Sequence, residues 1–190
     1  MLEASQIISN ERDTYYNFRT NEKLPFYTYK AIEASAAALL TGLLFEIGRD
    51  FLEPLLAIYS ILIGFSFSVL FSLVAQKPEK NKSDAIEDDL AFDRISKLHK
   101  ELFHNVSYFI LVALTLLVVS LACFAFQGLN ASLSSWLVQQ HKLVGTAIEI
   151  AHVCLRSAAI FTIMFLIVDS IVSFSRIVGR VVFYFENRVG

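Results

Sequence analysis

The chain has 190 residues, of which 55% are apolar, and its mean hydropathy is +0.55. Soluble domains usually contain about 45–50% apolar residues, so the composition predicts an integral membrane protein built as an all-α helical bundle. The formal net charge of −2 argues against direct binding of nucleic acid, because phosphate recognition needs a clustered basic surface. Cys123 and Cys154 lie in apolar segments, where they are either packing residues or a single disulfide.

Residues 1–30 are predicted to form a cytosolic N-terminal arm that ends near Pro25. The arm lacks an apolar core followed by a cleavage site, so we expect no signal peptide. A transmembrane hairpin is expected over 31–76, with one span at about 31–48 and another at about 55–76. Glu33 and Glu46 are interpreted as interfacial charges rather than buried acids.

Both spans of this hairpin carry small residues at four-residue spacing, which forms a flat stripe for close packing of another helix. The positions are Ala34, Ala38 and Gly42 in the first span, and Ser60, Gly64, Ser68 and Ser72 in the second. The contact would lie within one subunit or between the subunits of a homo-oligomer. The alternative is that small residues are simply frequent in membrane helices.

The segment 77–105 is rich in charge and is predicted to be a cytosolic connection. Asp84 and Glu87 have the spacing of a helix-capping box. Beyond them Ile95, Leu98 and Leu102 form an apolar stripe typical of an amphipathic helix. We expect this helix to continue without a break into the third span, as an extension that protrudes from the bilayer.

The third and fourth spans are expected within 106–175, joined by an outer connection at 127–144 that contains a short interfacial helix around Trp136. The fourth span contains twelve uncharged residues, 157–168, between Arg156 and Asp169. Residues 176–190 are predicted to be a cytosolic basic and aromatic tail.

Lysine and arginine are distributed unevenly between the connections. The arm, the 77–105 connection and the tail carry thirteen, whereas the two opposite turns carry only Arg49 and Lys142. Because positively charged connections stay in the cytoplasm, this predicts four spans in the inner (plasma) membrane with both termini cytoplasmic.

No catalytic, cofactor or metal motif is found: the chain has no glycine-rich phosphate loop, no His-Glu-x-x-His and no Gly-x-Ser-x-Gly. His99 and His104 lie roughly 140° apart around a helix, which is a poor arrangement for one metal ion. We therefore expect no enzyme, no cofactor and no metal.

The last helix carries the only polar residues whose spacing predicts specific contacts between them. Glu149, His152 and Arg156 share a helix face and are expected to form a charge-compensated ladder. Asp169 lies on roughly the opposite side, where Arg176 or Ser173 is expected to satisfy it. Its role is either structural or the transfer of an ion or proton.

In the tail, basic residues alternate with apolar and aromatic ones, which is typical of an anchor at an anionic membrane surface. The more specific hypothesis is that the tail, the 84–104 helix and the arm together form a docking surface for a cytosolic protein. The residues that would carry it are Ile95, Leu98, Leu102, Arg176, Arg180, Phe183, Tyr184 and Phe185.

Three function classes follow: a non-enzymatic oligomeric scaffold or sensor that holds a cytosolic effector, a small channel or transporter that uses Asp169, and, least supported, a membrane enzyme. In its four-span layout, its charged 77–105 connection and its basic tail, the chain resembles the four-pass membrane subunit of Kiwa-type bacterial anti-phage systems. The resemblance implies a membrane sensor of infection that assembles as a tetramer and controls a separate cytosolic DNA-binding effector.

Overall fold

The computed structural model describes residues 4–15, 25–43, 49–75, 86–137 and 142–189. Regular structure in these ranges is entirely helical. The helices are α1 (Ala4–Asp13), α2 (Phe26–Leu43), α3 (Arg49–Ala75), α4 (Ile86–Leu137) and α5 (Lys142–Val189). The prediction of an all-α fold is confirmed.

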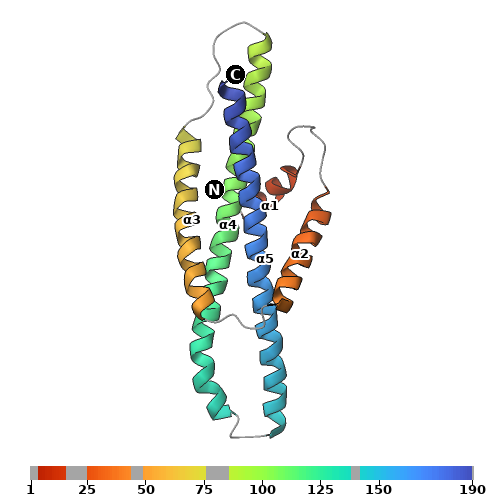
Figure 1. Cartoon of the computed structure of the whole chain (residues 1–190), viewed down its shortest axis with the longest axis vertical. Coiled ribbons are helices and arrows are strands. Elements are labelled where there is room, and N and C mark those ends of the chain that lie inside the picture. Colours follow the sequence, from red (N-terminus) through yellow and green to blue (C-terminus); the bar gives the residue numbers. More distant parts are fainter. Residues whose placement is uncertain (1–3, 16–24, 44–48, 76–85, 138–141, 190) are drawn as a thin grey trace.

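The long helices α4 and α5 run antiparallel and side by side, and the others pack around this pair (Figure 1). Helix α3 contacts α4, and α2 contacts α5 on the opposite flank. Helix α1 packs against α4. Both α4 and α5 extend past the ends of α2 and α3 that face the 138–141 connection (Figure 1).

The core lies along the contact between α4 and α5. Phe109 and Leu116 of α4 and Ile163 of α5 are almost completely buried, and the ring of Phe109 lies 5.8 Å from that of Phe174. Ala37 of α2 and Leu52 of α3, both fully buried, join the flanking helices to this core.

Three helical stretches are long and apolar enough to cross a membrane: Asp50–Ala75, Ile95–Ala125 and Val153–Phe183. Many of their large apolar side chains face outward; Ile61 and Leu155, for example, are 73% and 71% exposed. An exposed apolar surface of this extent suits contact with lipid. These stretches contain the second, third and fourth predicted spans.

The first predicted span, 31–48, is not among these stretches. Helix α2 has 18 residues and includes Lys30 and Glu33, while residues 44–48, with Glu46, lie outside the described ranges. The first span, and with it the total of four, therefore remains a prediction.

The helices α4 and α5 extend beyond the predicted spans. Helix α4 runs unbroken from Ile86 to Leu137, so the predicted extension of the third span is present, while Asp84 lies outside the described residues. The same helix also includes most of 127–144, in place of a separate interfacial helix. Helix α5 likewise continues through 176 to Val189. Neither stretch contains a proline, and an established helix propagates readily.

Candidate functional site: a buried ion-pair cluster

Charged side chains from α1, α2 and α5 meet inside the bundle, together with a tyrosine of α4. They form two groups, one around Asp169 and one around Arg176. The local sequence gives no sign of this meeting, because the partners are separated by up to 166 residues in the chain.

Asp169 of α5 is 2% exposed and forms an ion pair with Lys30 of α2. The Tyr108 hydroxyl of α4 donates a hydrogen bond of 2.8 Å to Oδ2 of Asp169. The expected partners, Arg176 and Ser173, are on α5 itself, whereas the observed partners come from α2 and α4. Asp169 thus connects three helices, which spacing along one helix does not reveal.

Glu33 is also buried, at 3% exposure, and its Oε2 lies 2.7 Å from Nζ of Lys30. The interpretation of Glu33 as an interfacial charge is therefore wrong. The helix face that carries Lys30, Glu33 and Ala37 is the buried one, because α2 packs against α5. Lys30 pairs with the carboxylates of both Glu33 and Asp169, which offsets the free-energy cost of burying them.

The second group fixes α1 to α5. Nη2 of Arg176 lies 2.5 Å from Oε1 of the buried Glu11, and its guanidinium stacks over the Tyr15 ring at 4.1 Å. Arg180, 2% exposed, donates a hydrogen bond of 2.5 Å from Nη2 to the backbone carbonyl of Thr14. The arm is therefore not separate from the bundle.

Thr14 and Tyr15 are held in place by the end of α1. The Thr14 hydroxyl and the Thr14 backbone N–H both donate to the Glu11 carbonyl, at 2.7 and 3.0 Å. The Tyr15 ring then packs edge-on against Phe26 of α2, 4.8 Å between centroids. The arm thereby contacts the start of α2 as well as α5.

Burial raises the pKa of Glu11, and the neighbouring Arg176 guanidinium opposes the shift. Among the residues that the structure describes, the three acids of the cluster balance its three bases when all are ionised. The acids are Glu11, Glu33 and Asp169, and the bases are Lys30, Arg176 and Arg180. Balance matters because an unpaired buried charge costs several kcal/mol.

A polar contact also joins α3 to α5. The hydroxyls of Tyr59 and Ser170 are hydrogen-bonded in the buried interior. Since the Ser170 hydroxyl donates to the Ile167 carbonyl at 2.8 Å, Tyr59 is the donor in this pair.

The predicted small-residue stripes face away from the bundle. Ala34 is half-buried, whereas the other six positions are exposed: Ala38, Gly42, Ser60, Gly64, Ser68 and Ser72. A methyl group added at Gly42 or Gly64 would meet no atom within 4 Å. Neither stripe packs inside this chain as described.

The other predicted residues are placed as follows. Leu98 and Leu102 are buried, while Ile95 and Phe183 are half-buried. Arg156 is exposed, but the side chains of its expected ladder partners, Glu149 and His152, lie outside the described part, as do those of Tyr184 and Phe185. Cys123 and Cys154 are free thiols.

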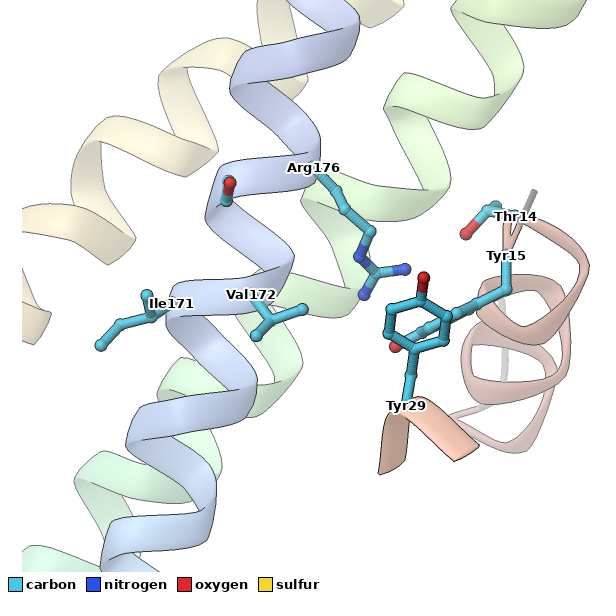
Figure 2. Close-up of a pocket in the computed structure, with 7 residues that line it drawn as sticks. Thr14, Tyr15, Tyr29, Ile171, Val172 and Arg176 are labelled. Atoms are coloured by element: carbon cyan, nitrogen blue, oxygen red, sulfur yellow. The ribbon is translucent and has the colours of Figure 1, made fainter. Parts of the chain in front are cut away.

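A hollow of about 370 Å³ opens beside the second group, between α5, the end of α1 and the start of α2. Figure 2 shows Val172 and Arg176 pointing from α5 toward the rings of Tyr15 and Tyr29. Among the residues that the structure describes, no group of three or more His, Cys, Asp or Glu side chains is arranged to hold a metal ion.

Long apolar helices with outward-facing apolar side chains, joined by a buried and charge-balanced cluster, make up the architecture of a membrane-embedded helical protein. No protein-family model, no curated protein and no solved structure matches the chain.

Proposed function

We propose that this chain is a four-pass inner-membrane protein, with both termini in the cytoplasm, that acts without catalysis as an oligomeric scaffold or sensor for a cytosolic effector. The observation that carries the proposal is the docking of α1 on the membrane helix α5 through Glu11 and Arg176. A cytosolic arm held this way changes position when α5 moves against its neighbours.

The placement in the bilayer is supported by charge and by connectivity. The first span would consist of α2 continued through 44–48, antiparallel to α3. The positively charged arm, connection and tail would then share the cytoplasmic side. Lys30 and Asp169 would lie just inside the cytoplasmic boundary, where their pairing removes the cost of burying either charge.

Oligomerisation is supported by the outward faces of α2 and α3. Seven small residues on these faces offer flat surfaces, and six of them are exposed in the described part of the chain. Helices in lipid associate through small residues because these permit close backbone contact. A tetramer is the number implied by the resemblance to Kiwa-type membrane subunits.

The effector would be held by the cytosolic ends of α4 and α5, which extend side by side beyond α2 (Figure 1). Helix α1 would border this platform through its contacts with α4 and α5. The resemblance to Kiwa-type membrane subunits implies a more specific role, that of a membrane sensor in anti-phage defence.

The proposal is tested by purifying the full chain from native membranes in mild detergent and identifying the cytosolic proteins retained with it. Glu11→Arg should displace α1 by repulsion from Arg176 and change the retained amount of a specific protein. The charge swap, Glu11→Arg with Arg176→Glu, should restore it. Absence of any enriched cytosolic protein, or equal retention by all three chains, would refute the scaffold role.

A small oligomeric channel or transporter is the alternative, and the observation that favours it is the deep burial of Asp169. The ion pair with Lys30 instead favours a structural role, because a neutralised carboxylate attracts a passing cation only weakly. Ion flux through reconstituted protein decides between them. Flux that is abolished in Asp169→Asn, with the fold intact, would establish the channel.

A further inference from the structure

The hollow beside Arg176 combines three kinds of lining. Its lining includes the apolar residues Ile171 and Val172, the aromatic residues Tyr15 and Tyr29, and the guanidinium of Arg176. The Ile171 side chain points to the other side of α5, away from Arg176 (Figure 2). Thr14 and Ser175 add hydroxyl groups. Such a lining suits a molecule that is apolar at one end and anionic at the other.

Arg176 retains donors that could bind the anionic end. Its Nη2 serves Glu11 and Ser173, at 2.5 and 3.2 Å. Its Nε and Nη1 are buried and have no hydrogen-bond partner among the described residues. A buried donor without a partner is costly, and the N–H groups at Nε and Nη1 could each donate to a phosphate oxygen.

The ion pair beside the hollow joins Arg176 to Glu11. Burial raises the pKa of Glu11, which reduces the negative charge that would oppose an anion there.

The surface of α5 next to the hollow could bind the apolar end of such a molecule. Ile171 and Phe174 are 61% and 40% exposed, so an apolar surface leads away from the hollow. Tyrosines are enriched at the headgroup level of a bilayer, and anionic lipids of the cytoplasmic leaflet attract basic residues.

We infer that the hollow between α1, α2 and α5 binds an anionic phospholipid, with the headgroup phosphate on Arg176 and an acyl chain along the apolar surface of α5. This rests on the proposed position of the 171–176 region at the cytoplasmic boundary of the bilayer. The lipid would complete the contact between α1 and α5, so the arm would respond to the composition of the membrane.

The test titrates the delipidated full chain in detergent and counts bound molecules by native mass spectrometry. The probes are phosphatidylglycerol, phosphatidylcholine and inorganic phosphate. Phosphatidylglycerol should bind at least about tenfold more tightly than phosphatidylcholine, because the choline cation of the latter neutralises its phosphate and is repelled by Arg176. Inorganic phosphate, which lacks the apolar end, should bind far more weakly.

Two variants locate the site. Val172→Phe fills the hollow but leaves Arg176 and Glu11 in place, and should reduce phosphatidylglycerol binding at least about tenfold. Val178→Phe adds the same group to α5 at an exposed position outside the hollow and should bind like the wild type. Glu11→Gln with Arg176→Gln keeps a neutral polar pair and should lose the preference for the anionic lipid.

The results distinguish a lipid headgroup from free phosphate as the occupant of the hollow. Equal binding of both lipids, or normal phosphatidylglycerol binding by Val172→Phe, would overturn the inference. Inorganic phosphate bound as tightly as lipid would also overturn it, since the occupant would then be a free anion. Lipid counting involves no protein partner, so its failure would leave the scaffold proposal untouched.

Discussion

At the scale of single residues, Lys30 holds the most consequential position. It serves two acids, Glu33 and Asp169, that are themselves almost fully buried. Removing one partner of a buried ion pair leaves an uncompensated charge, which is far more damaging than the absence of the whole group.

Lys30→Ala is therefore expected to destabilise the fold by about 3–5 kcal/mol. The neutral replacement of all three residues, by Lys30→Met, Glu33→Gln and Asp169→Asn, should recover most of this loss. Denaturant unfolding in detergent micelles measures both. Ile32→Ala, at an exposed position of the same helix, is the control; a triple variant as unstable as Lys30→Ala would show that charge balance is not the cause.

Glu11 makes the docking of α1 dependent on pH. Because burial raises its pKa, the docked state binds the proton more tightly than the undocked state does. Docking is therefore strongest below the ordinary pKa of glutamate and weakens as pH rises through the raised value. The charged groups that act on Glu11 are Arg176, Arg180 and Lys30, all cationic across this range.

Spin labels at Ser9 and Val182, both exposed, would follow this docking through their distance distribution. The distribution should broaden as pH rises from 4 to 8 in the wild type and stay constant in Glu11→Gln. Broadening toward low pH would contradict the assigned cause.

At the scale of elements, apolar composition alone identified the long helices, because hydropathy over about 20 residues is a strong signal. The continuity of α4 from its amphipathic part into the apolar part was also predictable from the stripe at Ile95, Leu98 and Leu102. The contacts of α1 were not predictable. Glu11 and Arg176 meet through tertiary packing, and neither lies in a recognisable motif.

The buried face of α2 shows the same limit. The spacing of Ala34, Ala38 and Gly42 indicated one packing face, but the structure buries Ala37 beside Glu33 instead. Periodicity identifies faces that permit packing, whereas the ion pair from Lys30 to Asp169 decides which face turns to α5.

A pair of adjacent substitutions tests this orientation. Ala37→Leu should destabilise the fold by about 1–3 kcal/mol, because the site is fully buried and has no room. Ala38→Leu, at an exposed position, should leave stability unchanged and weaken self-association if the stripe joins subunits. Unfolding midpoints and cross-linking in reconstituted bilayers measure the two effects. A reversed pattern would mean that α2 is rotated.

At the scale of the whole molecule, the number of spans decides whether the two ends of the chain share a side of the membrane. With α2 as a span, both ends lie on the same side; with three spans, they lie on opposite sides. A reporter active only in the cytoplasm should work when fused after Gly190 and fail when inserted in the 138–141 connection. Cytoplasmic activity at one terminus and not at the other would contradict four spans.

The unbroken length of α4 has a mechanical consequence. Its 52 residues span about 78 Å at 1.5 Å per residue, more than twice the hydrocarbon thickness of roughly 30 Å. Such a rod transmits a tilt from one end to the other without a hinge. The hydrogen bond between Tyr108 and Asp169 ties α4 to α5 near the middle of this length, so a tilt of α4 about that point would carry its two ends in opposite directions.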